Sequence, residues 1–448
     1  MTLQTISITK VINGGYGFGH LNNGQIVLIH NTLPEETVVA TIEEKKKNHS
    51  FGKAQHIVTP HPLRRKPPCR YYTHCGGCDL QHCDYVLQLT IKKDIIKELL
   101  ARQQDKALQA AVQLVAPPIK SNNEFGYRQR IRLQVKNSGQ IGFLRFRSHE
   151  IIAIDSCMLA AKTINASLSA LISDDFFQTL TKYCSELELL RNPESDKTIC
   201  IFRIVRKPRP ADKKAAEKLV LAIDSIESIY FSGNNFQTTG PIGYTSENQK
   251  DRLLTIRYPH LSGLSEGLDL SWEASGFCQL NLTQNRKLIE TVLKFCDCSS
   301  DDTVLDLFCG MGNFSIPLAQ LSKNVLGIEG QGSAIRSARK NGAHANLNNV
   351  IFRKKPVHST CKELIKEKKI FDSVVIDPPR QGIPDLAHDL ALLTKKKLTY
   401  ISCDPATLCR DLQNLLTEGF TISKIQPIDM FPQTHHIETV VLLTSPQR

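Results

Sequence analysis

Hydrophobic and polar residues change their spacing along the chain, and the first 60 residues read as strands. Short alternating or continuous apolar stretches, such as TISITKVI, QIVLIH and ETVVATIEE, are separated by turns rich in Gly and Asn. Short strands joined by such turns are typical of a small β-barrel, and barrels of this size often present one face to RNA. We therefore predict a barrel over residues 1–60.

A helical spacing follows a basic, Pro-rich segment, HPLRRKPP. Apolar residues of 84–104 recur at close to 3.6-residue intervals, which predicts a helix. We expect a helix within residues 84–115 that packs on the C-terminal domain. Residues 125–265 then mix strand-like and helix-like stretches, so we predict that 61–265 form an α+β middle domain.

The remaining residues, 266–448, alternate apolar strand-like runs with amphipathic helices. This alternation predicts an α/β domain with a mostly parallel, doubly wound sheet. The last two strands have no helix between them, so one of the two should be antiparallel. Ligands of such sheets bind at the carboxyl ends of the strands.

Charge separates the two halves of the chain. The protein has 56 Lys and Arg against 44 Asp and Glu, and 35 of the basic but 24 of the acidic residues precede residue 266. The first 265 residues therefore carry a net charge of +11 and the rest +1. Such an asymmetry favours binding of a nucleic acid.

The chain has no apolar run long enough to span a membrane and no signal-peptide pattern at its start. We therefore expect a cytoplasmic protein whose 14 cysteines are mostly reduced. Clustered cysteines are then candidates for metal binding or catalysis.

Two predicted strand ends suggest a cofactor site. The first ends in DLFCGMGN, where Gly310 and Gly312 let the backbone approach a ligand closely. Glu329 ends the next strand, and a carboxylate there suits the hydroxyls of a ribose. A phosphate-binding loop would have a third glycine where Ser315 stands. The pattern therefore favours an adenosyl ligand without phosphate, S-adenosylmethionine.

Two further strand ends carry a rigid turn and a thiol. DPPR at 377–380 holds Asp377 at a strand tip and lacks the aromatic residue that methyltransferases of exocyclic amines need there. Cys403 stands directly before a predicted helix, whose N-terminal end we expect to lower the thiol pKa and favour a nucleophilic thiolate. Glu438 opens the last strand in FPQTHHIE, where its carboxylate can face Cys403 and act as a base.

A cysteine cluster lies between the barrel and the predicted helix. Cys69, Cys75 and Cys78 have the spacing C-x5-C-G-G-C, and either Cys83 or the distant Cys157 can supply a fourth thiolate. Zinc and an iron–sulfur cluster both bind four thiolates, and spacing alone would choose Cys83 for zinc.

Taken together, these motifs resemble the bacterial RNA (uracil-5-)-methyltransferase family. The resemblance rests on DLFCGMGNFS at 306–315, DPPRQG at 377–382, SCDPATLCRDL at 402–412 and FPQTHHIE at 431–438. The first 60 residues resemble a TRAM domain, an OB-like RNA-binding barrel. With the cysteine cluster, the resemblance covers nearly the whole chain and is to the branch of the family that methylates 23S rRNA.

This resemblance implies a Rossmann-like, S-adenosylmethionine-dependent methyltransferase domain and an iron–sulfur middle domain that binds RNA. It implies that Cys403 adds to carbon 6 of a flipped-out uracil and that Glu438 removes the proton from carbon 5. The implied cofactor contacts are Gln279, Phe308, Asn313, Glu329 and Asp377. The implied ligands of a 4Fe–4S cluster are Cys69, Cys75, Cys78 and Cys157.

Two departures from the family pattern stand out. Asp404 follows Cys403 where the family commonly has Asn, and its charge would raise the pKa of the thiol. Lys354-Lys355-Pro356 replaces a polar residue that the family places against adenine, so we expect no adenine contact there.

The expected partner is 23S rRNA, with no membrane and no obligate protein partner. Two alternatives remain at this point, the same chemistry on tRNA and a non-catalytic RNA-binding or assembly factor.

Overall fold

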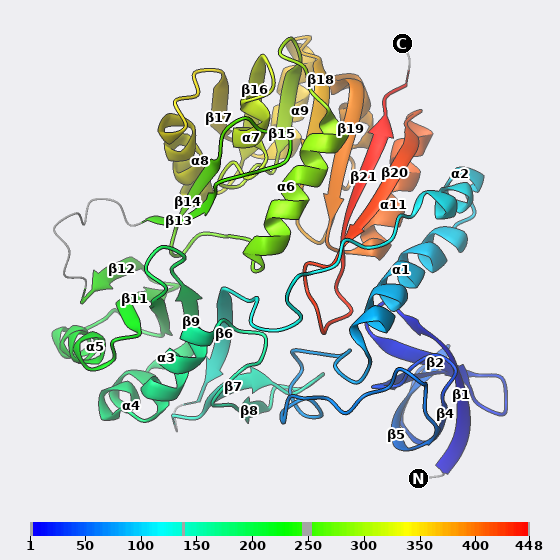
Figure 1. Cartoon of the computed structure of the whole chain (residues 1–448), viewed down its shortest axis with the longest axis vertical. Coiled ribbons are helices and arrows are strands. Elements are labelled where there is room, and N and C mark those ends of the chain that lie inside the picture. Colours follow the sequence, from blue (N-terminus) through cyan, green and yellow to red (C-terminus); the bar gives the residue numbers. More distant parts are fainter. Residues whose placement is uncertain (1–2, 137–138, 244–252, 447–448) are drawn as a thin grey trace.

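An N-terminal closed barrel begins the computed structural model, which describes residues 3–136, 139–243 and 253–446 (Figure 1). Its strand order is β1-β2-β3-β5-β4, and only β3 and β5 pair in parallel. Alternate apolar side chains such as Ile6, Ile8, Val27 and Ile29 fill the interior, as period-2 strands require. The predicted barrel is confirmed. Its strands are β1 (Leu3–Ile12), β2 (Tyr16–His20), β3 (Ile26–His30), β4 (Thr37–Lys45) and β5 (His49–Thr59).

The helix expected within residues 84–115 is present as α1 (Tyr85–Ala101), and two shorter helical elements follow it. They are α2 (Lys106–Ala110) and the 3-10 helix η1 (Ala111–Leu114). The break has a local cause, because the Asp105 carboxylate accepts hydrogen bonds from the amides of Ala107 and Leu108 and so starts a new helix. Helix α1 packs against α11 (Pro405–Thr417) of the C-terminal domain.

The two ends of α1 have different neighbours. Ile91 and Ile95 share an apolar cluster with Val11 and Leu33 of the barrel. Ile96 and Leu100, one turn further on, belong to the core of the C-terminal domain. Helix α1 therefore connects the barrel to the C-terminal domain through continuous apolar packing.

The middle domain is a seven-stranded mixed sheet with helices beside it, in the strand order β12-β11-β10-β9-β6-β7-β8. Its elements are β6 (Arg130–Val135), β7 (Ile141–Leu144), β8 (Ile151–Ala153), α3 (Lys162–Ile172), α4 (Asp175–Thr181), β9 (Cys184–Arg191), β10 (Thr198–Ile204), α5 (Pro210–Ala222), β11 (Ile226–Gly233) and β12 (Phe236–Ile242). A hairpin of β13 (Leu253–Tyr258) and β14 (Leu268–Glu273) then leads into the C-terminal domain.

The C-terminal domain has a second seven-stranded sheet, in the order β17-β16-β15-β18-β19-β21-β20. Its first five strands along the chain are parallel, and β21 is antiparallel to β19 and β20, as expected for the final pair. The strands are β15 (Thr303–Leu307), β16 (Asn324–Glu329), β17 (Val350–Lys354), β18 (Phe371–Ile376), β19 (Thr394–Ser402), β20 (Thr421–Ile428) and β21 (Glu438–Thr444).

Helices cover both faces of this sheet and form two apolar cores. One face carries α6 (Leu282–Cys296), α7 (Ser315–Ala319) and α8 (Gly332–His344), and the other carries α9 (Val357–Lys366), α10 (Ala387–Leu393) and α11. The carboxyl ends of the parallel strands therefore meet at one edge, where the fold places its ligands. No helix in the described ranges has the length and apolar character needed to cross a bilayer.

Candidate active site

Cys403 and Glu438 lie next to each other at the end of the C-terminal sheet where its parallel strands have their carboxyl ends. Strand β19 ends at Ser402, which pairs with Thr439 of the antiparallel β21. The residues just beyond this pair are Cys403 on one strand and Glu438 on the other. Because β21 runs against β19, its first residue reaches the same edge as the last residue of β19. The structure therefore brings together the two residues that the sequence assigns to catalysis.

A cavity of about 250 Å³ opens beside this thiol. It is lined by Asn13, Gly14, Arg380, Cys403, Asp404, Pro405, His435 and His436. Two of these residues belong to the turn between β1 and β2 of the barrel, about 390 residues away in sequence. Nothing in the sequence of this turn indicates that it reaches the active site, since only tertiary packing brings it there.

The thiol pKa differs from the sequence prediction. We expected the helix beginning at Pro405 to lower it, but the pKa of Cys403 is raised to about 11. Burial is the main cause, and the carboxylates of Glu438, Asp377 and Asp404 act in the same direction. Arg380 is the opposing charge and lowers the pKa. Burial and the acidic residues around the sulfur therefore set the direction of the shift.

Asp404 has a structural role that an asparagine could also fill. Its Oδ1 accepts a hydrogen bond of 2.8 Å from the amide of Thr407 and caps the N-terminus of α11. The replacement of the family's Asn thus preserves the cap and adds a negative charge beside Cys403.

Three buried carboxyl groups cluster along the same sheet edge. Burial raises the pKa of Asp306 to about 7 and that of Asp377 to about 7, and it raises the pKa of Glu438 well above its ordinary value. Asp306 accepts a hydrogen bond of 2.5 Å from the Ser315 hydroxyl, which opposes the shift. Asp377 further raises the pKa of Glu438 through charge repulsion. A cationic ligand at this edge would favour the ionised forms of all three.

The predicted cofactor loop is fixed by Glu329 and leaves open space at Gly310. Glu329 accepts hydrogen bonds from the amides of Gly310 (3.2 Å) and Gln331 (2.7 Å), so its carboxylate is held at the tip of β16. Phe308 has a positive φ of 62°, which turns the chain sharply after β15. A Cβ atom added to Gly310 would meet nothing within 4 Å. The loop therefore leaves room for a ligand above its backbone.

Asn313 is fixed by a residue that the sequence analysis missed. Its side-chain amide exchanges two hydrogen bonds, of 2.9 and 3.0 Å, with Asn285 on α6. Asn285 is buried and also donates to the Tyr258 hydroxyl. A polar residue on the inner face of an amphipathic helix was the available signal. Gln279, half-buried in the loop before α6, makes no hydrogen bond with any described residue.

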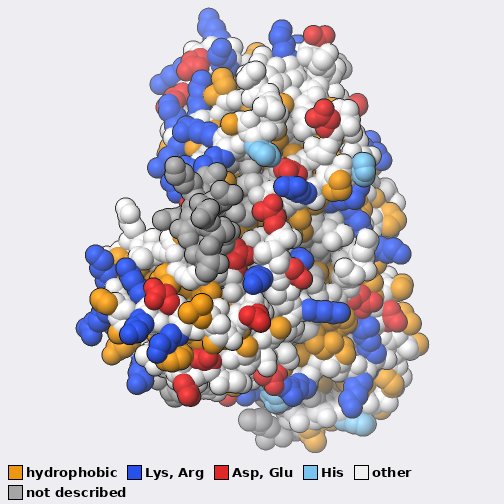
Figure 2. Space-filling view, turned by 60° about the vertical axis from the view of Figure 1, so that its left-hand side comes forward, with side chains coloured by type: hydrophobic (Ala, Val, Ile, Leu, Met, Phe, Trp, Pro, Cys, Tyr) orange, Lys and Arg blue, Asp and Glu red, His pale blue; other side chains and the backbone are white. Residues whose placement is uncertain are grey.

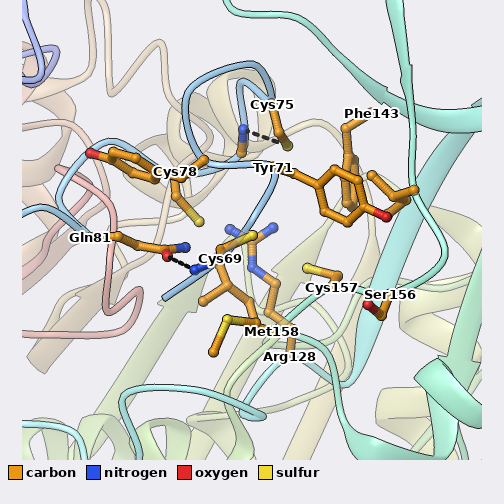
Figure 3. A pocket seen from close by; sticks show the side chains of 14 residues that line it. Cys69, Tyr71, Cys75, Cys78, Gln81, Arg128, Phe143, Ser156, Cys157 and Met158 are labelled. Carbon is orange, nitrogen blue, oxygen red and sulfur yellow. Dashed lines mark hydrogen bonds between the residues drawn. The ribbon is translucent and has the colours of Figure 1, made fainter. Parts of the chain in front are cut away.

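A second site brings together four cysteines of the segment after the barrel and of the middle domain. Cys69, Cys75, Cys78 and Cys157 line one pocket together with Arg128 (Figure 3). The Cys69 amide donates to Gln81 Oε1 and the Gly77 amide to Cys75 Sγ, which shapes the loop around the thiols. Cys83 is absent from this pocket and lies in the apolar cluster between the barrel and α1. The structure thus brings Cys157, rather than Cys83, beside the three clustered cysteines.

The donor set of this pocket can be compared with what metals need. Within the described ranges, no group of three or more His, Cys, Asp or Glu is arranged to hold a single metal ion. In a zinc site, all four thiolates lie roughly 2.3 Å from the same ion. In a four-iron cluster the four thiolates bind four different iron atoms and therefore lie further apart. The buried Arg128 Nε has no hydrogen-bond partner among the described residues. A cationic group at a thiol-lined pocket suits an anionic occupant.

Comparisons with known proteins identify the family of this chain. Residues 268–446 match the tRNA (Uracil-5-)-methyltransferase family and residues 2–54 match the TRAM domain. The chain is 33% identical to the 23S rRNA (uracil(1939)-C(5))-methyltransferase RlmD of Shewanella sediminis and 31% identical to that of Shewanella woodyi. Each alignment covers 98% of this chain and 95% of the relative.

A solved structure is also similar over the full length. The Pyrococcus abyssi tRNA (uracil-54, C5)-methyltransferase in complex with S-adenosyl-L-homocysteine has a TM-score of 0.69 and 25% identity. The similarity covers 98% of this chain and 100% of that one. The chain therefore belongs to the RNA uracil-5-methyltransferase family of enzymes, with an N-terminal TRAM domain.

Proposed function

We propose that this protein methylates carbon 5 of a specific uridine in 23S rRNA, with S-adenosylmethionine as the methyl donor. The observation that carries the proposal is that Cys403, which lines the cavity, lies beside the buried Glu438 at the start of β21. Whole-chain similarity to enzymes named for 23S rRNA supports the choice of substrate. A cytoplasmic location follows from such a substrate and from the many free cysteines.

The chemistry requires a nucleophile and a base on the same side of the pyrimidine. Cys403 Sγ forms a bond to carbon 6 of uracil, and the displaced electron pair makes carbon 5 nucleophilic. S-adenosylmethionine, when bound, supplies the methyl group that carbon 5 takes. Glu438 then removes the carbon 5 proton, the double bond re-forms, and the bond between carbon 6 and Cys403 breaks. Arg380 favours the thiolate at the start and again when the sulfur leaves.

We assign the cofactor to the open space beside the loop that follows β15. Phe308, Asn313, Glu329, Gln279 and Asp377 are the proposed contacts, with Glu329 facing the ribose hydroxyls. The buried carboxyl groups of Asp306 and Asp377 fit a methyl donor whose sulfonium and ammonium groups are positively charged. The neighbouring structure that holds S-adenosyl-L-homocysteine supports a ligand of this class.

A tRNA substrate is the second candidate. The Pyrococcus abyssi tRNA enzyme matches 98% of this chain, including the barrel, so an N-terminal barrel by itself does not separate the two substrates. The rRNA proposal rests on the relatives that are at least 30% identical over the whole chain.

We further propose a 4Fe–4S cluster on Cys69, Cys75, Cys78 and Cys157. Convergence of the four thiols supports it, and so does Arg128, because a four-thiolate cluster is anionic. When bound, the cluster would join the segment after the barrel to the middle domain. Anaerobically purified protein should show a broad absorption band at roughly 400 nm that Cys78→Ser abolishes. A colourless protein that contains zinc would contradict the cluster.

The RNA surface of the middle domain is proposed at the N-terminal end of α5. Lys207, Arg209, Lys213 and Lys214 form no ion pair with any described residue. Two partly exposed aromatic rings contact other cations of this region, since Lys218 lies over Phe176 at 4.5 Å and Arg206 lies over Tyr183 at 4.0 Å. Figure 2 shows Lys and Arg side chains gathered with exposed hydrophobic ones toward the lower left of the molecule. Cations and aromatic faces together suit RNA phosphates and bases.

The test of the proposal is methyl transfer from labelled S-adenosylmethionine to unmodified 23S rRNA, followed by digestion to nucleosides. The expected product is 5-methyluridine at one position, with none formed by Cys403→Ala. Unmodified tRNA assayed in parallel tests the second candidate. If the parent protein methylates tRNA but not rRNA, tRNA replaces rRNA as the assigned substrate. Equal product from Cys403→Ala would overturn the mechanism.

A further inference from the structure

A network of hydrogen bonds connects the cysteine-bearing segment to the active site. We name residues 69–83 the cysteine loop and residues 429–437, between β20 and β21, the histidine loop. The backbone amides of Asp79 and Leu80 both donate to the carbonyl oxygen of Gln433, at 3.1 Å each. The Asp79 carboxylate also contacts His435, with 2.6 Å between Oδ2 and Nδ1. The residue after Cys78 thus holds the histidine loop at two points.

Gln433 is held so firmly that the backbone of the histidine loop has little freedom. It is fully buried with a positive φ of 70°, a conformation that surrounding contacts must maintain in a residue other than glycine. Its side-chain oxygen accepts a hydrogen bond from Gln88 of α1, its side-chain nitrogen donates to Glu124, and its backbone amide donates to the Gln88 oxygen. Arg65 donates to the same side-chain oxygen. Arg65 of the segment after the barrel, the cysteine loop and α1 therefore converge on one residue.

The consequence for the active site follows from what comes next in the chain. His435 and His436 line the cavity beside Cys403, with their ring centroids 4.2 Å apart. Glu438 is only three residues after His435. A shift of the histidine loop would therefore move one wall of the cavity and the start of β21 together.

Asp79 also contacts the barrel. A Cβ atom added to Gly15 would lie 3.1 Å from the Asp79 carboxyl carbon, so the β1–β2 turn rests on this side chain. The neighbouring residues of that turn, Asn13 and Gly14, line the same cavity. The second oxygen of Asp79, Oδ1, is buried without a hydrogen-bond partner among the described residues. One carboxylate thus abuts two walls of the cavity.

We propose that Asp79 is a positioning residue for methyl transfer, acting through His435 to hold the histidine loop against Cys403. The inference rests on the proposed function, because methyl transfer is its readout. It assigns the cysteine loop a part in shaping the catalytic cavity, in addition to any role in binding a metal group.

The experiment compares Asp79→Ala, Asp79→Asn, His435→Ala and the double variant Asp79→Ala/His435→Ala in the full-length protein. Asp79→Ala should lower kcat on saturating RNA by roughly 10- to 100-fold, the cost of misplacing groups by about an ångström. Affinity for S-adenosylmethionine should stay within about twofold of the parent. Asp79→Asn keeps an oxygen that can accept from His435 and should recover part of the rate.

The double variant distinguishes a positioning role through His435 from a general structural role, because it measures whether the two losses of rate are independent. If Asp79 acts through His435, adding Asp79→Ala to His435→Ala should cost little further rate. Asp155→Ala is the matched control, since Asp155 pairs with Arg70 of the cysteine loop but has no contact with the histidine loop. Its kcat should equal that of the parent.

Two results would overturn the inference, a parent-like kcat in Asp79→Ala and fully multiplicative losses in the double variant. Should Asp79→Ala fail to fold, Asp79→Asn can be combined with His435→Ala instead. Fully multiplicative losses of rate in that double variant would likewise overturn the inference. Failure of the proposed function looks different, because the parent protein itself would then form no 5-methyluridine.

Discussion

At the scale of single residues, Cys403 is a protonated nucleophile in an acidic setting. Its pKa of about 11 comes from burial and from the carboxylates of Glu438, Asp377 and Asp404, with Arg380 opposing them. The reaction needs the thiolate, and it also needs Glu438 in its ionised form, although burial raises the pKa of that carboxyl as well. Both groups lose their protons as the pH rises, so both requirements make the rate of methyl transfer increase with pH.

The rate of methyl transfer should therefore increase with pH. Because the thiolate fraction grows about tenfold per unit below the thiol pKa, kcat/KM should rise by up to about tenfold per unit between pH 7 and 9. Arg380→Gln removes a cation that lowers the thiol pKa and should reduce the rate by a similar factor across this range, because the whole range lies below the pKa. A flat profile of initial rates over this range, measured with labelled cofactor, would contradict the raised pKa of Cys403.

At the scale of elements, α1 is attached to the active-site region by a buried ion pair. Lys92 Nζ lies 2.5 Å from Asp429 Oδ1 with both side chains fully buried, and it also donates to the carbonyl oxygen of Phe431. Tyr85 donates to the other oxygen of Asp429 at 2.7 Å. Apolar periodicity predicted that a helix lies here. Periodicity alone does not locate the break, whose signal is the capping residue Asp105, and the partner 337 residues away could not be predicted because it depends on tertiary packing.

Breaking this pair should destabilise the protein strongly. Lys92→Ala leaves the Asp429 carboxylate buried without its cation, so the free energy of unfolding should fall by about 3–5 kcal/mol. Lys92→Met combined with Asp429→Leu, which leaves no buried charge, should cost less than the single change. The neighbouring Lys93→Ala should stay within about 0.5 kcal/mol of the parent. Urea unfolding followed by circular dichroism measures all three, and a small effect of Lys92→Ala would show that the pair is not the attachment described.

At the scale of the whole molecule, RNA would meet two surfaces that lie far apart in the sequence. The barrel contributes Asn13 and Gly14 to the cavity at Cys403, while the unpaired cations near α5 belong to the middle domain. Strand and helix patterns predicted the barrel and the doubly wound sheet, and the sheet rule then placed Cys403 and Glu438 at one edge. The approach of the β1–β2 turn to that edge was not predictable, since it depends on how separate domains pack.

The α5 surface should contribute affinity without affecting chemistry. Lys213→Glu with Lys214→Glu should weaken binding of a long rRNA fragment and reduce the slope of log Kd against log salt by about one for each phosphate that the variant no longer neutralises. The rate at saturating RNA should not change. Lys368→Glu with Lys369→Glu, the same charge change beyond α9, is the control and should bind like the parent. Filter-binding titrations at several salt concentrations make the comparison. Equal slopes for the two double variants would show that α5 is not part of the RNA-binding surface.

The most direct test of the account uses Glu438→Gln and unmodified rRNA, analysed for protein covalently attached to RNA under denaturing conditions. If Glu438 removes the carbon 5 proton, the methylated uracil cannot leave the sulfur of Cys403. A protein–RNA adduct should then accumulate, and it should be absent when Cys403→Ala is added. Free 5-methyluridine formed at the parent rate, or an adduct that persists without Cys403, would contradict the proposed reaction.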